Sequence, residues 1–400
     1  MKSERVYNAC LLSAITRKKL EKNTNLKYSV ILSNSAKRGI IPQNVQFDKN
    51  IANEENIDRY YVVKVGDFIY NPRISTTAPC GPINQNDCCD GVASPLYTVF
   101  SCKTECVYDK YLKFYFQTSL WHEYIRSVAN TGARHDRMNV SDKDFFSMLI
   151  KLPPIAEQRK IAEILSAQDR IIELKTKLLE EKKRLKKYLC QLIMGGNKIK
   201  LARGYSVHLL SSITKKKLIK NKDLKYSVVL SNSAKYGIVP QNVQFDKNIA
   251  NEENIDRYYV AEIGDFIYNP RISTSAPCGP INQNDCCDGV VSPLYTVFSC
   301  SAECVCDKYL KYYFQTSLWH EYIQSVANTG ARYDRMNVSD KDFFSMAINL
   351  PPLNTQRQCV VLLDAFSNVI KLMEENLEQE KLKKKALMQH LLTGKVRVTV

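Results

Sequence analysis

The 400-residue sequence lacks the phosphate-binding and metal-binding patterns of several large enzyme classes. It has no G-x-x-x-x-G-K-[ST] loop and no G-x-G-x-x-G turn, which hold nucleotide phosphates in many enzymes. Histidine is scarce, with five residues, and no H-E-x-x-H zinc motif occurs. Asn71-Pro72-Arg73-Ile74 lacks the second proline and the aromatic residue of an N-P-P-[YF] methyltransferase loop, which stacks on the target base. We therefore expect no catalysis by this chain itself.

Long apolar runs are also missing. No stretch approaches the roughly 18 consecutive apolar residues of a membrane-spanning helix, and the N-terminal apolar run is too short for a secretion signal. The sequence therefore predicts a cytoplasmic protein without a membrane partner. In a reducing cytoplasm its fourteen cysteines are expected to be small buried thiols, not disulfides. A zinc site remains an alternative, although the repeated C-x7-C-C-x12-C-x3-C spacing lacks paired CxxC knuckles.

Acidic residues are outnumbered by basic ones. The chain has 41 aspartates and glutamates against 57 lysines and arginines, a formal net charge of +16. Such an excess favours a polyanionic partner, because phosphate contacts release condensed counterions. A protein that is merely basic is the alternative that charge alone leaves open.

The most informative feature that is present is an internal copy. Residues 26–153 recur at 224–351 without a gap, and 112 of these 128 positions are identical. The following segments, 154–196 and 352–394, match at only 15 of 43 positions. Two equal copies of one surface suit a target that itself has two equal parts.

The diverged segments carry a heptad pattern that predicts two long helices, each following a Pro-Pro pair. In the first helix one apolar series is Ile164, Ile171, Leu178, Leu185 and Leu192, and a neighbouring series is Leu165, Ile172, Leu179, Lys186 and Ile193. The matching series in the second helix is Leu363, Ile370, Leu377, Lys384 and Leu391. The simplest use of two such seams is to pack on each other; separate surface helices are the alternative.

Each copied segment mixes short strands with helices and predicts a small mixed α/β domain with a curved sheet. An amphipathic helix is expected over 109–129, with Leu112, Leu120 and Ile125 among its inward residues. Ser141 is expected to cap a second helix. We place the boundaries at 1–153 for the first globular domain, 154–196 for the first long helix, 197–351 for the second domain and 352–400 for the second helix and tail.

Polar loops in each copy have the residue types that read DNA. Arginine binds guanine bidentately, asparagine and glutamine bind adenine, and hydroxyl groups hold phosphates. Solvated loops without a partner are the alternative. The candidates in the first copy are Asn34, Lys37, Asn71, Arg73, Ser75, Thr76, Asn84, Gln85, Arg134, His135 and Arg137. Those in the second copy are Asn232, Lys235, Asn269, Arg271, Ser273, Thr274, Asn282, Gln283, Arg332, Tyr333 and Arg335.

Several stretches resemble the specificity subunit of type I restriction-modification systems. They are GDFIYNPR, SPLYTVF, TGAR-x-DRMNVSDKDFFSM, the L-P-P-x-x-x-Q-R bridges at 152–159 and 350–357, and the terminal LMQHLLTGKVRV. The resemblance covers essentially the whole chain. The second bridge lacks the glutamate of the first, Glu157, so we expect an altered contact with a partner subunit there.

The resemblance implies a fold and a function. Each globular copy is expected to be a target-recognition domain on double-stranded DNA, and the long helices are expected to pair as an antiparallel coiled coil. The subunit is expected to hold no cofactor or metal and to recruit two methyltransferase subunits, and through them restriction subunits. S-adenosylmethionine, ATP and Mg²⁺ are expected in those partners.

Two nearly equal domains suggest a palindromic site interrupted by an unread spacer, since two-fold protein symmetry is matched by palindromic DNA. Three differences between the copies bear on that symmetry: Arg38/Tyr236, Arg126/Gln324 and His135/Tyr333. His135/Tyr333 is the most important of these differences, because His135 lies between Arg134 and Arg137. A protein that dimerises through its helices and a non-specific nucleic-acid scaffold are the rival functions.

Overall fold

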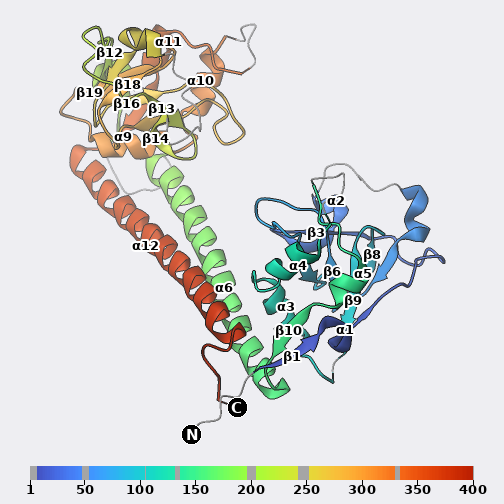
Figure 1. Ribbon diagram of the computed structural model, residues 1–400. Helices are drawn as coiled ribbons and strands as arrows, with labels where there is room; N and C mark the ends of the chain where they lie inside the picture. The colour runs from blue at the N-terminus through green and yellow to red at the C-terminus, as the bar shows by residue number, and fades with distance from the viewer. Residues whose placement is uncertain are drawn as a thin grey trace. The chain divides into compact units, whose positions relative to one another are not determined.

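A computed structural model describes residues 7–46, 54–103, 105–130, 136–195, 204–241, 252–328 and 334–399. The chain forms two compact units, Met1–Thr176 with Asn376–Val400, and Lys177–Glu375. Each unit contains one globular domain and one half of each long helix, α6 (Ile155–Met194) and α12 (Leu353–Leu392) (Figure 1). The domain boundaries expected from the sequence therefore remain a prediction, because the compact units divide both helices.

The first domain contains two four-stranded sheets and one strand pair. An antiparallel sheet has the order β2-β9-β6-β7, and a mixed sheet has the order β4-β3-β8-β5, with β3 and β8 parallel. The strands are β1 (Asn8–Leu11), β2 (Thr16–Lys18), β3 (Ile31–Ser35), β4 (Gly39–Pro42), β5 (Tyr61–Val63), β6 (Phe68–Tyr70), β7 (Ile83–Gln85), β8 (Gly91–Ala93), β9 (Thr98–Cys102) and β10 (Leu149–Leu152). The helices are α1 (Leu12–Ile15), α2 (Gln43–Gln46), α3 (Asp109–Phe116), α4 (His122–Val128) and α5 (Asp142–Phe146), with a 3-10 turn at Glu54–Arg59.

The second domain repeats this plan. Its larger sheet has the order β12-β19-β16-β17, and the pairs β13-β14 and β15-β18 correspond to the mixed sheet. The strands are β11 (Ser206–Leu209), β12 (Thr214–Lys217), β13 (Leu230–Ser233), β14 (Gly237–Pro240), β15 (Tyr259–Ala261), β16 (Phe266–Tyr268), β17 (Ile281–Gln283), β18 (Gly289–Val291), β19 (Thr296–Cys300) and β20 (Ala347–Leu350). The helices are α7 (Leu210–Ile213), α9 (Asp307–Phe314), α10 (His320–Val326) and α11 (Asp340–Phe344), with a 3-10 turn at Glu252–Arg257.

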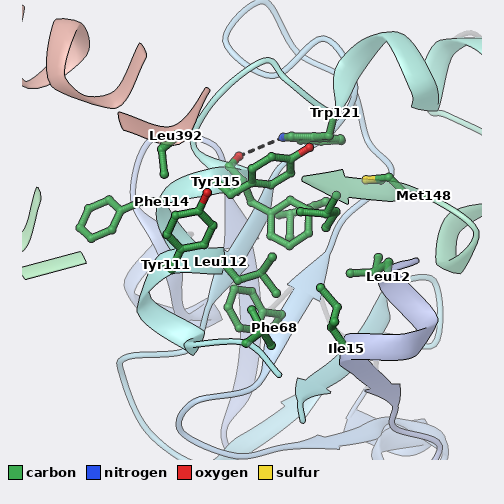
Figure 2. Close-up of a cluster of buried hydrophobic side chains, with 14 of the residues drawn as sticks. Leu12, Ile15, Phe68, Tyr111, Leu112, Phe114, Tyr115, Trp121, Met148 and Leu392 are labelled. Atoms are coloured by element: carbon green, nitrogen blue, oxygen red, sulfur yellow. Dashed lines mark hydrogen bonds between the residues drawn. The ribbon is translucent and has the colours of Figure 1, made fainter. Parts of the chain in front are cut away.

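The expected helix over 109–129 is wrong as one element. It breaks between α3 and α4, where the Thr118 hydroxyl donates to the Tyr115 carbonyl and the chain turns. The turn exposes Leu120 and sends the Trp121 ring into the core, where its Nε1 donates to the Phe116 carbonyl at 3.2 Å (Figure 2). The Ser141 cap is confirmed, since its hydroxyl accepts from the Asp144 amide at 3.1 Å.

Each domain core includes the ends of the long helices. In the first unit, Leu392 of α12 packs against the aromatic cluster of α3, as Figure 2 shows, and Ile161 and Leu165 of α6 join it. In the second unit, Cys190 and Met194 of α6 and Leu363 of α12 are part of the hydrophobic core of the second domain. The helix ends are therefore part of each hydrophobic core and are fixed by its burial.

The long helices pair antiparallel within each unit. In the first unit the Lys384 ammonium lies 2.6 Å from Asp169, and the Lys175 ammonium lies 2.6 Å from Glu380. In the second unit Lys183 lies 2.5 Å from Glu374. As the residue number rises along α6, its partner's number falls along α12, which confirms the expected antiparallel coiled coil.

The buried seam is narrower than the sequence pattern suggested. Leu165 and Leu179 of α6 and Leu363, Ile370 and Leu377 of α12 are buried. The middle positions of the other α6 series are exposed, with Ile171, Leu178 and Leu185 between 39% and 47% accessible, whereas Ile164 packs against the first core. Two paired helices share only one face, so the second apolar stripe on each helix stays uncovered.

The first residues of the long helices are tied to their domains differently in the two units. Gln158 and Gln356 are buried, and each donates to a Pro-Pro carbonyl at 2.9 Å and accepts a domain amide at 2.8 Å. Glu157 is also buried and forms a two-pronged ion pair with Arg397 of the C-terminal tail. The second copy has Thr355 at this position. Glu157 thus has a partner inside its own chain, which the sequence interpretation did not foresee.

The cysteine expectation is confirmed for only one repeated pair. Cys80 and Cys278 are buried, whereas Cys88, Cys106, Cys286 and Cys304 are exposed. Within the described ranges no group of three or more His, Cys, Asp or Glu side chains is arranged to hold a metal ion. No helix in these ranges is long and apolar enough to cross a membrane.

Candidate nucleic-acid interface

Three asparagines join the candidate loops of the first domain into one structure. The Asn34 amide donates to the Ile69 carbonyl at 2.7 Å and to the Pro82 carbonyl at 3.0 Å. The Asn71 amide donates to the Asn34 carbonyl at 3.1 Å, and the Asn84 amide donates to Asn34 Oδ1 at 2.7 Å. These bonds hold the end of β3 against the loop after β6 and against β7.

The second domain has the same network. Asn232 donates to the Ile267 and Pro280 carbonyls at 2.6 Å and 3.0 Å, and it is bonded by Asn269 and Asn282. Asn34, Asn71, Asn232 and Asn269 are all buried. Their amide groups form hydrogen bonds inside the domain and so support the loops, and a role of these residues in reading adenine stays a prediction.

The candidate glutamines, Gln85 and Gln283, also form their hydrogen bonds inside the domain. Gln85 and Gln283 are buried. Each donates from Nε2 to the carbonyl of a glycine, Gly66 or Gly264, and to an α3 or α9 aspartate, Asp109 or Asp307. Each glutamine therefore connects its strand, β7 or β17, to the neighbouring helix, and its role in reading a base stays a prediction.

The arginine-containing loops lie side by side. The Ile74 amide donates to the Asp136 carbonyl at 3.0 Å, and the Met138 amide donates to the Pro72 carbonyl at 2.9 Å. This places Arg73 and Arg137 opposite each other in an antiparallel bridge. The second domain repeats the bridge with Arg271 and Arg335, at 3.0 Å and 2.9 Å. Loops about 60 residues apart in the sequence thus form one surface in each domain.

The charges of this surface are arranged around an acidic residue. The Asp136 carboxylate lies 3.4 Å from Arg137 Nε, and Asp334 lies 3.3 Å from Arg335 Nε. Hydrogen bonding from Arg137, with a smaller contribution from Arg73, holds the pKa of Asp136 below its usual range. Arg73 and Arg271 remain exposed, so their guanidinium groups are accessible to a partner.

The loop after β6 has a shape that only glycine permits. Gly81 has a φ of +77°, and a Cβ there would lie 2.1 Å from the Asn71 carbonyl oxygen. Ser75 and Ala78 exchange two backbone hydrogen bonds at 3.0 Å, and Ser75 Oγ accepts from the Ala78 amide. This turn presents Ser75 and Thr76 to solvent, as the copy does with Ser273 and Thr274.

The hairpin turn between β3 and β4 lies beside this loop. Ala36 of the turn and Thr77 of the loop line one cavity. Lys37 and its copy Lys235 are exposed in the turn. Arg134, His135, Arg332 and Tyr333 lie outside the described residues, so their part in the surface is still a prediction.

Sequence reasoning missed Tyr97, which lies behind the arginine surface. Burial raises the pKa of its hydroxyl, while the Ser33 hydroxyl and the Arg73 cation oppose that shift. Tyr295 has the corresponding neighbours Ser231 and Arg271. The recurring SPLYTVF segment was the available signal, because it places a tyrosine between a proline turn and the buried strand residues Val99 and Phe100.

Comparison with known proteins assigns the chain to a family. The family model for the type I restriction modification DNA specificity domain matches twice, over residues 13–184 and 210–382. The chain belongs to this family. Each match spans one globular domain and most of the long helix that follows it, so the internal copy is a repeat of the family's own unit.

Two curated relatives of this family come from Methanocaldococcus jannaschii. The chain is 26% identical over 315 residues to a putative type I restriction enzyme MjaX specificity subunit, covering 74% of this chain and 69% of the relative. It is 25% identical over 330 residues to the type I restriction enzyme MjaVIII specificity subunit, covering 77% and 75%.

Solved structures share the fold over nearly the full length. The HsdS subunit from Thermoanaerobacter tengcongensis matches with a TM-score of 0.52 and 16% identity, covering 99% of both chains. A chain from a study of type I R-M complex assembly and conformational transition matches with a TM-score of 0.62 and 15% identity, covering 99% and 100%. The mixed α/β architecture with two repeated domains and two long helices is therefore that of the family.

Proposed function

We propose that this chain is the DNA recognition subunit of a type I restriction-modification complex and that each domain reads one half of an interrupted palindrome. The observation that carries the proposal is the loop surface with the paired arginines, which occurs twice with matching hydrogen bonds. The excess of basic residues supplies the attraction to phosphates.

The antiparallel helices favour an inverted arrangement of the half-sites. A two-fold rotation places each helix of an antiparallel pair on the other helix. DNA-reading domains that are related by such a rotation match a palindrome. The base pairs between the half-sites would then be an unread spacer whose length depends on the helices. Each mismatched base pair in a half-site should cost about 1–3 kcal/mol.

We further propose that the chain is not itself catalytic and that it recruits two methyltransferase subunits through its helices. The support is the second, exposed apolar stripe, with Ile171, Leu178 and Leu185 on α6 and Leu362 and Val369 on α12. Apolar heptad positions at helical spacing suit partner helices that pack alongside. Restriction subunits would join through the methyltransferase, and S-adenosylmethionine, ATP and Mg²⁺ would be used by these partners.

Sequencing of methylated bases in cells that carry the system tests this function. The expected result is one inverted repeat with a fixed gap, methylated in both halves. A motif without an inverted repeat would sink the palindrome, and unmethylated DNA would sink the assignment to a modification complex.

Binding competition at raised salt separates the rival functions. A sequence reader keeps its preferred duplex after salt has weakened the phosphate contacts. A non-specific scaffold loses all preference, and a helix-mediated dimer that binds no DNA shows none at any salt concentration.

A further inference from the structure

Each domain has a groove beside the hairpin turn, in addition to the arginine surface. In the first domain the turn between β3 and β4, the end of β7 and helix α3 enclose a volume of about 450 Å³. The corresponding groove of the second domain has a volume of about 430 Å³. The two grooves lie at equivalent places in the repeat.

Every lining position that the two grooves share has the same residue type, with one exception. That exception is Arg38 in the first domain and Tyr236 in the second. The copies differ at 16 positions, and only the Arg38/Tyr236 position is among the lining positions that the two grooves share.

The backbone of the turn is the same in both copies, so only the side chain differs. Ser35 Oγ accepts from the Lys37 and Arg38 amides at 3.4 Å, and Ser233 Oγ accepts from the Lys235 and Tyr236 amides at 3.3 Å. The glycine that ends each turn has a φ of +70°. This is the left-handed position of a three-residue hairpin loop, which fixes the direction of the turn.

The exchange changes the charge of the groove. Lys113 is paired with Asp87, and Lys311 with Asp285, so these charges cancel in both domains. Lys37 and Arg38 are exposed, and neither side chain has an ion-pair partner among the described residues. In the second domain the described turn residues include one cation without an ion-pair partner, Lys235. Its ammonium lies 4.8 Å from the centre of the Tyr236 ring.

We propose that Arg38 gives the first domain a contact to a DNA phosphate that the second domain lacks. A guanidinium binds phosphate through two parallel hydrogen bonds, whereas a tyrosine offers one neutral hydroxyl. The turn adjoins the loop of Arg73 through the Asn34–Asn71 hydrogen bond, so a duplex on the arginine surface passes close to it. Both domains then have the same base preference but hold the backbone unequally. This inference rests on the proposed function.

Reciprocal exchange in the full-length chain tests the inference. The variants are Arg38→Tyr and Tyr236→Arg, and the probe is a duplex with the site that methylation sequencing defines. The logarithm of the binding constant is measured against the logarithm of salt concentration, because each neutralised phosphate adds about 0.9 to the slope. Arg38→Tyr should reduce the slope by about 0.9, and Tyr236→Arg should increase it by about 0.9.

Arg126→Gln and Gln324→Arg provide charge-matched controls. They exchange another of the described charge differences between the copies, at exposed positions of α4 and α10 outside the hairpin turn, and alter the net charge by the same amount. Their slopes should equal that of the unaltered chain. If Arg38→Tyr behaves like Arg126→Gln, the phosphate contact is refuted. If Arg38→Tyr instead relaxes the preference at one base pair, Arg38 reads a base and the inference also fails.

The same titration separates this inference from the proposed function. A chain that does not distinguish the site from a duplex with both half-sites scrambled refutes the proposed function. A chain that prefers the site but has equal slopes for all four variants refutes only the role of Arg38.

Discussion

The two units have almost identical loop surfaces and unequal helix attachments. The asparagine network and the arginine bridge recur with distances that agree within 0.1 Å. At the attachments, the first unit has the Glu157–Arg397 ion pair, with the Arg397 guanidinium 4.7 Å from the Tyr7 ring centre. In the second unit the Tyr312 hydroxyl donates to Asp364 of α12, whereas the first domain has Phe114 at this position.

The two loop surfaces are therefore the part of the chain that is kept equal, whereas the helix attachments differ. Equal loops suit two equal half-sites, while each attachment need only hold its own helix ends. The Phe114/Tyr312 difference illustrates this, because it changes a contact to the helices and leaves the loops untouched.

The largest effect is expected from Arg397→Ala. It leaves the Glu157 carboxylate buried without its ion-pair partner, which costs about 2–4 kcal/mol because a third of the Arg397 side chain is exposed. Hydrogen exchange should show lost protection in the first unit only. The double variant Glu157→Thr/Arg397→Ala copies the residue of the second unit and should recover part of the loss. Equal loss in both units would contradict the unequal attachment.

Gly81→Ala and Gly279→Ala should damage the two loop surfaces equally. The added Cβ would meet a carbonyl oxygen at 2.1 Å in both domains, and the positive φ adds strain, together about 3 kcal/mol. Exchange of the Ile74 and Ile272 amides, which bond Asp136 and Asp334, should accelerate by similar factors. Gly66→Ala is the control, since it also has positive φ but its Cβ would meet nothing within 4 Å. An effect no larger than that of the control would contradict the role of the close approach.

Arg73→Ala and Arg271→Ala should each weaken site-specific binding by about 1–3 kcal/mol. Both guanidinium groups are exposed on equivalent surfaces, so the two losses should agree within about threefold in affinity. Binding to the methylation-defined duplex measures them. A large loss from only one variant would show that the domains are not used equivalently.

Leu178→Glu should weaken binding of the methyltransferase subunits by about tenfold, or about 1.4 kcal/mol. Leu178 lies 47% exposed in the uncovered stripe of α6, where a carboxylate disrupts apolar helix packing. Co-purification and titration with the partner subunit measure the change. Leu96→Glu is the matched control, because Leu96 is 59% exposed on the first domain. Equal weakening by both variants would contradict docking on the helices.

Much of the fold followed from patterns in the sequence. The repeat predicted two equal domains, and the heptads after each Pro-Pro pair predicted the two long helices. The pattern did not distinguish the buried series of Leu165 from the exposed series of Ile171, because both are apolar at the same spacing. Only the position of the partner helix decides between them.

The candidate surface was predicted in part. The sequence identified the loops of Arg73 and Arg137, but their backbone bridge joins residues that are distant in the chain. The sequence did not reveal that Asn34 donates to two carbonyls inside the domain, because these partners are distant in the chain. Arg38 gained importance for a similar reason, because its groove is formed by segments that meet only in the fold.

Two equal domains that read DNA in inverted orientation should distinguish an inverted repeat from a direct repeat. The most direct measurement compares two duplexes with the same two half-sites and the same spacing, arranged as an inverted repeat or as a direct repeat. The full-length chain should bind the inverted repeat at least about tenfold more tightly, since a wrongly oriented half-site loses base contacts worth more than about 1 kcal/mol. Equal affinity for both arrangements, or a preference for the direct repeat, would contradict it.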